Sequence, residues 1–171
     1  MLLALLIATS LGTRIAGRAH EAAGLDSVHQ LERGANDDCS GFARLIYQRE
    51  GVDLARLPAR PGENGVTNIR RLAAARRALR RTPRPGDLVF FRNTTSRRGF
   101  THVGIVDSVR YPEVTFVHRS GHGIVRSRLD LLHPRRRESN DFIKRGAHPR
   151  LAGELVAGFA KPDALRQGGA P

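Results

Sequence analysis

The single cysteine of the chain stands in surroundings that suit a nucleophile. Cys39 lies in the segment Asp37-Asp38-Cys39-Ser40-Gly41-Phe42, and a helical pattern of apolar residues follows it directly. A thiol at a helix N-terminus feels the positive end of the helix dipole, which lowers the thiol pKa, and the free backbone N–H groups there can receive an oxyanion. The alternative is a buried cysteine acting as a small hydrophobic residue, against which the polar neighbours Asp38 and Ser40 argue.

A cysteine nucleophile needs a base, and two of the seven histidines are placed to supply one. His102 begins one predicted strand and His118 ends the next. The turn from Arg110 to Glu113 would join these strands as a hairpin and bring both imidazoles to one face. A thiol opposite them would complete a candidate triad of Cys39, His102 and His118. The structural alternatives are a solvent-facing His102 and a capping or core role for His118.

The remaining titratable residues indicate no metal site and no other cofactor. A chain with one cysteine cannot form a four-cysteine zinc site or an intramolecular disulfide bond. His118 and His122 are four residues apart, but the intervening Ser120 and Gly121 disfavour the helix that a zinc-binding pair at this spacing needs.

The apolar pattern that must position these residues changes near residue 85. Before it, apolar residues recur at helical spacing around residues 15–23, 42–46 and 69–79, with a loop at 57–65. After it, short β-rich runs occupy 88–91, 102–109, 114–118, 123–128 and 151–159. Helices followed by an antiparallel sheet predict an α+β domain.

Length and composition favour one such domain. The chain has 171 residues, of which 40% are hydrophobic. We assign residues 14–160 to the domain and 161–171 to a flexible tail. Residues 1–13 are uncharged and apolar, but their apolar run is shorter than the roughly 20 residues of a membrane span. They are either a signal peptide, which predicts a secreted or periplasmic protein, or part of a buried first helix.

The charge is strongly positive and unevenly distributed. The formal net charge is +13, and thirteen arginines against three acidic residues lie between Arg56 and Arg110. Arginines 70, 71, 76, 77, 80 and 81 border the predicted helix at 69–79. A polyanion is a candidate partner for this region, and a solvated helix face is the alternative. Nucleic acid is disfavoured because only nine residues are aromatic. We expect a monomer.

Four segments together resemble one family of bacterial enzymes. Asp38-Cys39-Ser40-Gly41, Pro85-Gly86-Asp87-Leu88-Val89-Phe90-Phe91, His102-Val103-Gly104-Ile105 and Phe116-Val117-His118 stand in the order and rough spacing of the NlpC-type cell-wall cysteine endopeptidases. The resemblance implies a papain-like core of helices packed on an antiparallel sheet. It also implies hydrolysis of peptidoglycan stem peptides, typically between γ-D-Glu and a diamino acid. For such an enzyme, anionic cell-wall polymer or lipopolysaccharide is the candidate partner of the arginine-rich region.

The resemblance also implies roles for individual residues. Cys39 matches the nucleophile, His102 the base and His118 the third, orienting residue. Asp38 and Ser40 match positions that help to hold the free amine of L-Ala in some members. A tyrosine that lines the substrate site in such enzymes is missing from residues 27–34, which leaves recognition of that amine open. His29 could fill the vacated space, and an ordinary surface histidine is the alternative.

Other functions remain compatible with the same residues. The candidate triad could serve an amidase, an effector toxin or an acyltransferase. The basic region could instead belong to a non-catalytic binder of wall polymer or nucleic acid.

Overall fold

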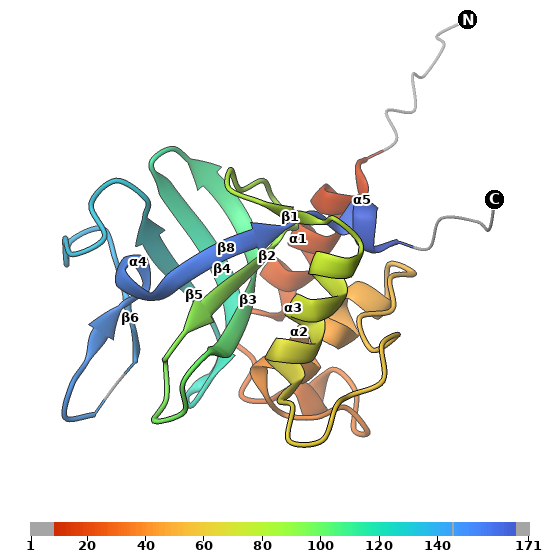
Figure 1. Cartoon of the computed structure of the whole chain (residues 1–171). Helices are drawn as coiled ribbons and strands as arrows, with labels where there is room; N and C mark the ends of the chain where they lie inside the picture. The colour runs from red at the N-terminus through yellow and green to blue at the C-terminus, as the bar shows by residue number, and fades with distance from the viewer. Residues whose placement is uncertain (1–8, 145, 167–171) are drawn as a thin grey trace, which may run out of the picture.

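The computed structural model describes residues 9–144 and 146–166, and Figure 1 shows α1, α2 and α3 gathered on one side of a sheet. The helices are α1 (Leu11–Ala22), the 3-10 helix η1 (Val28–Gln30), α2 (Cys39–Gln48), α3 (Gly65–Ala75), α4 (Ala152–Leu155) and α5 (Pro162–Leu165). The strands are β1 (Leu79–Arg80), β2 (Leu88–Arg92), β3 (Phe100–Arg110), β4 (Glu113–Ser120), β5 (Gly123–Asp130), β6 (Phe142–Lys144), β7 (Arg150–Leu151) and β8 (Val156–Ala160).

The main sheet has six strands in the order β1-β8-β2-β3-β4-β5, and each neighbouring pair is antiparallel. Strands β6 and β7 form a separate antiparallel pair. The predicted hairpin between residues 102 and 118 is confirmed, because β3 ends at Arg110 and β4 begins at Glu113. The predicted α+β class is therefore confirmed. Strands β3 and β4, which carry His102 and His118, each have a neighbouring strand on both sides.

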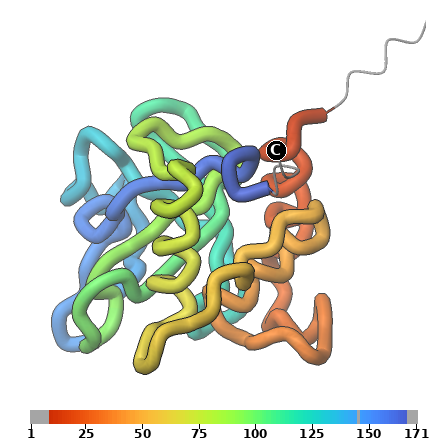
Figure 2. The backbone as a smooth tube through the Cα atoms, turned by 45° about the vertical axis from the view of Figure 1, so that its right-hand side comes forward, coloured from red at the N-terminus to blue at the C-terminus, as the bar shows by residue number. Residues whose placement is uncertain are grey.

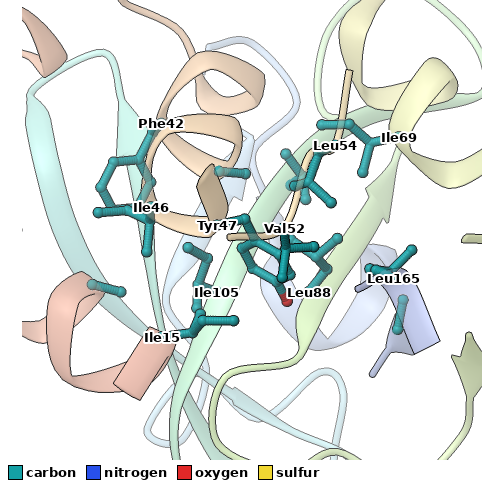
Figure 3. Close-up of a cluster of buried hydrophobic side chains, with 14 of the residues drawn as sticks. Ile15, Phe42, Ile46, Tyr47, Val52, Leu54, Ile69, Leu88, Ile105 and Leu165 are labelled. Carbon is teal, nitrogen blue, oxygen red and sulfur yellow. The ribbon is translucent and has the colours of Figure 1, made fainter. Parts of the chain in front are cut away.

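The sheet carries an apolar cluster on each face because alternate residues of a strand point in opposite directions. On β2, Leu88 and Phe90 belong to the cluster beneath α1, α2 and α3, whereas Val89 and Phe91 belong to a second cluster with α4. Figure 3 shows the first cluster, in which side chains from α1, α2 and α3 meet Leu88 and Ile105 of the sheet. Strand β2 thus has both faces covered.

Two predicted elements end differently in the structure. The predicted strand at 151–159 is wrong in part, since α4 occupies residues 152–155 and only β8 continues as a strand. The helix predicted over 69–79 ends at Ala75, and Arg77 adopts a left-handed φ of 50°. The chain then turns so that Leu79 pairs with Ala160 of β8. Pairing with the sheet edge overrides the helical pattern.

The two ends of the described chain meet on one side of the molecule. Helix α1 begins at Leu11, where the Ser10 side chain accepts a hydrogen bond from the Thr13 N–H. Helix α5 packs against α1 and buries Leu165, which lies inside the segment 161–171 assigned to a tail (Figure 2). Residues 1–8 and 167–171 lie outside the described residues. Among residues 9–144 and 146–166, no helix is long and apolar enough to span a membrane.

Candidate active site

Cys39 is the first residue of α2, as the apolar spacing predicted. Phe42, Leu45 and Ile46 recur at helical spacing and are buried against the sheet, which places the start of the helix beside β3. Asp38 caps this helix, and its Oδ1 accepts hydrogen bonds of 2.7 Å from both the Gly41 N–H and the Ser40 hydroxyl. The N–H groups of the first residues of α2 are thus left without helical acceptors, next to the thiol.

Gly41 allows the preceding loop to approach this helix. A Cβ atom at position 41 would lie 2.0 Å from the carbonyl oxygen of Asn36, well inside van der Waals contact. The loop that leads to Cys39 therefore folds tightly against the first turn of α2. This close packing sets the position of the sulfur relative to the helix axis.

The structure brings the two candidate histidines together. Nε2 of His102 lies 2.8 Å from Nδ1 of His118, and Nε2 of His118 lies 3.1 Å from the hydroxyl oxygen of Ser127. Two tautomer assignments are compatible with these contacts, because the Ser127 hydroxyl can donate or accept. In the assignment that suits a base, His102 donates from Nε2 to Nδ1 of His118, and His118 donates from Nε2 to Ser127. This assignment leaves Nδ1 of His102 as a free lone pair. Nδ1 of His102 can therefore accept a proton while the contact of Nε2 with His118 fixes the orientation of the ring.

Ser127 is a residue of this site that the sequence reasoning missed. It lies on β5 opposite Phe116, whereas His118 lies opposite Val125, so Ser127 and His118 are diagonal neighbours on one face of the sheet. Val125 and Ser127 are two residues apart and therefore lie on one face of β5. Only the register of β5 against β4 shows that His118 lies on the same face. His118 is 4% exposed, and Ser127 supplies the polar partner that its inner nitrogen requires.

A second glycine makes room for the histidine pair. A Cβ atom on Gly104 would lie 2.9 Å from a ring carbon of Phe116, 3.0 Å from the Val117 carbonyl oxygen and 3.3 Å from Cβ of His118. Any larger residue at position 104 would push against the strand that carries His118. The glycine two residues after His102 thus serves the packing of the site.

Burial determines the protonation states of the thiol and the imidazole. Burial raises the pKa of the Cys39 thiol to about 11, although the backbone N–H groups of Val103, Ser40 and Cys39 act in the opposite direction. Burial also lowers the pKa of His102 to about 4 and that of His118 well below its usual value. The expectation of a lowered thiol pKa is therefore wrong, because desolvation outweighs the helix terminus. Near neutral pH the resting site holds a neutral thiol and neutral imidazoles.

Two cavities open at these residues. The smaller, about 350 Å³, is lined by Asp38, Cys39, Ser40, Asn64, Gly65, Val66, Thr95, Ser96, Arg97 and Thr101. The larger, about 670 Å³, includes His102, His118, Ser127, Arg119, His122 and Asp141 in its lining. Thr95 of the β2–β3 loop lines both cavities, which places them next to each other. The thiol therefore faces one cavity and the imidazole pair faces the other.

An ion pair that the sequence reasoning did not find joins the nucleophile loop to the strand of His118. The Arg119 guanidinium contacts both carboxylate oxygens of Asp37, at 2.7 and 2.8 Å. Asp37 also accepts a hydrogen bond of 2.8 Å from the Val28 N–H, and these contacts hold its pKa well below the usual range. Asp37 and Arg119 are 82 residues apart in sequence, so no local signal could reveal the pair.

The segment that lacks the tyrosine forms the short helix η1. Its Ser27 side chain caps the helix, and the Gln30 side chain accepts from the Asp26 and Ser27 N–H groups. His29 is exposed and does not line either of the two cavities. His122 lines the larger cavity, and no cluster of three metal-ligating side chains occurs in the described parts of the chain.

The chain is similar to one protein family and to a solved structure of a member of that family. The family model described as NlpC/P60 family matches residues 25–138, which include Cys39, His102 and His118. A crystal structure of an NlpC/P60 family protein from Bacillus cereus ATCC 10987 is similar, with a TM-score of 0.50 and 19% sequence identity.

The aligned part covers 91% of this chain and 41% of the Bacillus cereus chain, so this chain spans less than half the length of that protein. No curated protein matches the chain. The similarity in structure confirms the expected papain-like fold. The family model spans most of the domain and includes Cys39, His102 and His118. The chain therefore belongs to the NlpC/P60 family.

Proposed function

We propose that this protein is a cysteine peptidase that hydrolyses the amide bond between γ-D-Glu and the diamino acid of peptidoglycan stem peptides. Membership of the NlpC/P60 family supports a cell-wall peptidase, since the family consists generally of cysteine peptidases. The observation that carries the proposal is the relay from His102 through His118 to Ser127, on a strand whose Val103 N–H contacts the Cys39 thiol at the start of α2. An imidazole that is oriented through one nitrogen and offers a lone pair on the other is the base that a cysteine nucleophile needs.

The first half of the reaction forms a thioester. As the Cys39 sulfur attacks the γ-carbonyl carbon, the thiol proton passes to Nδ1 of His102, so that the thiolate exists only when substrate is in place. The N–H groups at the start of α2 stabilise the tetrahedral oxyanion. The C–N bond then breaks, and the imidazolium returns its proton to the leaving amine of the diamino acid.

The second half regenerates the enzyme. His102 takes a proton from a water molecule, whose oxygen attacks the thioester carbon. The C–S bond breaks, the sulfur recovers a proton from the imidazolium, and the γ-carboxylate of D-Glu is released. Throughout both halves, His118 keeps the His102 ring in the tautomer that leaves Nδ1 available.

The two cavities fit the two halves of such a substrate. The leaving amine takes its proton from His102, so the diamino acid belongs in the larger cavity that contains the imidazoles. The acyl half is attached to sulfur and belongs in the smaller cavity that contains Cys39. Asp38 and Ser40 line that smaller cavity, and we propose them as contacts of the acyl half, as the family resemblance implies.

We also propose that the protein acts outside the cytoplasm and contacts an anionic wall polymer through part of its arginine-rich region. Arg71 is held by Glu63, and Arg80 pairs with Asp87, so these side chains stabilise the fold. The exposed arginines 76, 77, 81 and 84 remain available to a polyanion, and Arg81 and Arg84 line a cavity of about 510 Å³ together with Lys161. These residues form what we call the basic edge, near β1.

The test is digestion of purified muropeptides with identification of the products by mass. The proposal expects free amine on the diamino acid and free γ-carboxylate on D-Glu, with no products from Cys39→Ala. Cleavage of a different amide by the wild-type protein would indicate an amidase acting at the same site, and acyl transfer to an added amine would indicate an acyltransferase. Identical absence of products from wild type and variant would overturn the peptidase proposal.

A further inference from the structure

The lining of the smaller cavity includes an arginine that the proposed chemistry leaves unused. Arg97 lies in the loop between β2 and β3 and lines the cavity together with Cys39, Asp38 and Ser96. Its backbone N–H donates to the Thr95 hydroxyl, and its side chain is exposed. In the described parts of the chain, no carboxylate forms an ion pair with Arg97.

Three other polar side chains of this cavity are committed to partners in the protein. The Asn64 amide caps α3 and donates to the Phe100 carbonyl, the Ser40 hydroxyl donates to Asp38, and the Thr101 hydroxyl accepts from the Thr94 N–H. Arg97 is also the only arginine or lysine in the lining. A negatively charged part of a bound molecule would therefore find one cationic partner in this cavity.

The acyl half of the proposed substrate has a negative charge of the right kind. When γ-D-Glu is attached through its side-chain carbonyl, its α-carboxylate stays free, a few bonds from the carbon that the sulfur attacks. A guanidinium matches a carboxylate with two parallel N–H donors, which adds orientation as well as energy. Cys39 and Arg97 thus line the same cavity, so a guanidinium is available to pair with this carboxylate.

We infer that Arg97 binds the α-carboxylate of γ-D-Glu and makes the enzyme selective for stems in which this carboxylate is free. Conversion of this α-carboxylate to a neutral amide removes the charge and one acceptor oxygen and leaves the size of the group nearly unchanged. The inference rests on the proposed function. It states that Arg97, on the loop between β2 and β3, discriminates the free α-carboxylate from the neutral amide. Arg97 is a substrate-binding residue in this reading and takes no part in proton transfer.

The experiment compares two synthetic tripeptides that differ only at this group: L-Ala-γ-D-Glu joined to a diamino acid, and the same peptide with the D-Glu α-carboxylate amidated. Both are offered to the wild-type protein, to Arg97→Gln and to Arg98→Gln. Arg98 is the matched control, because it is the neighbouring arginine of the same loop and lines neither of the two cavities. We expect the wild-type protein and Arg98→Gln to cleave the acid about tenfold faster in kcat/KM than the amide.

We expect Arg97→Gln to lose about tenfold on the acid and less than twofold on the amide, so that its preference disappears. An equal loss on both peptides would overturn the inference, because it would indicate disturbance of the loop and no contact with the carboxylate. No loss on either peptide would overturn it as well. Failure of the wild-type protein to cleave either peptide would instead overturn the proposed function, on which the inference rests.

Discussion

Nε2 of His102 lies 2.8 Å from Nδ1 of His118, and the two rings meet edge to face at an interplanar angle of 86°. The contact uses Nε2 of His102 and leaves its Nδ1 for the thiol proton. Because His118 is itself tied to Ser127, its ring cannot rotate without breaking a second hydrogen bond. The base is thus held by a relay of three side chains on three neighbouring strands.

The relay predicts a graded loss of activity. Cys39→Ala should abolish muropeptide hydrolysis, and His102→Ala should cost nearly as much because the thiol then keeps its proton and the leaving amine is unassisted. His118→Ala should cost less, since water can replace part of an orienting contact, and Ser127→Ala less still. Product formation followed by chromatography gives kcat for each variant. Full activity of Cys39→Ala would refute the assignment of the nucleophile.

The protonation states predict the pH dependence of both activity and thiol reactivity. His102 accepts a proton only as neutral imidazole, so kcat/KM should stay level around neutral pH and fall as the pH drops toward about 4. The thiol has a raised pKa of about 11, so alkylation by iodoacetamide should be slow at pH 7 and rise steadily with pH. The urea-unfolded protein is the control, since its thiol should titrate near ~8.5. An alkylation rate that levels off below pH 7 in the folded protein would instead indicate a preformed thiolate.

The absence of a tyrosine from residues 27–34 predicts weak dependence on the free amine of L-Ala. Because η1 offers no such side chain and His29 lies outside both cavities, stems still attached to sugar should be cut about as well as free tripeptide. The measurement is the ratio of kcat/KM for a muropeptide and for its sugar-free stem. A strict requirement for the free amine would show that another residue, with His29 as the first to test, anchors it.

The basic edge predicts salt-dependent attachment to the wall. Arg77→Glu combined with Arg81→Glu should weaken binding to whole sacculi and flatten its salt dependence, while cleavage of small soluble muropeptides changes little. Such contacts act through screened charge over about 8 Å at physiological salt and do not reach the reacting bond. Arg135→Glu with Arg136→Glu makes the same change in net charge at exposed positions elsewhere and serves as the control. Equal sacculus binding by the two double variants would assign the basic edge to an ordinary solvated surface.

Two glycine-to-alanine changes should move stability in opposite directions. Gly41→Ala places a Cβ atom 2.0 Å from the Asn36 carbonyl oxygen, and relieving this clash should cost about 1–3 kcal/mol in the free energy of unfolding. Gly17 lies on the exposed side of α1, and a Cβ atom added there would meet nothing within 4 Å. Gly17→Ala should therefore raise the free energy of unfolding by roughly 0.5–1 kcal/mol. Urea unfolding measures both. An unchanged free energy of unfolding for Gly41→Ala would show that the loop before Cys39 moves aside easily.

Local sequence was sufficient to predict the elements that carry the candidate triad. Asp38 is a good helix cap and the apolar spacing from Phe42 onward is helical, so the start of α2 at Cys39 could be read directly. The runs around His102 and His118 alternate or are apolar enough to be strands, and the short turn between them indicates a hairpin. These features depend on residues close together in the chain, which is why they were predicted.

Tertiary structure alone decided the partners and the protonation states of those residues. The diagonal contact of His118 with Ser127 depends on the register of β4 against β5, and the pair of Asp37 with Arg119 joins segments 82 residues apart. The direction of the Cys39 pKa shift depends on how much water the folded chain excludes from the thiol, so a helix position could not predict it. The end of α3 at Ala75 likewise follows from the pairing of Leu79 with β8, a contact that the helical pattern around it does not contain.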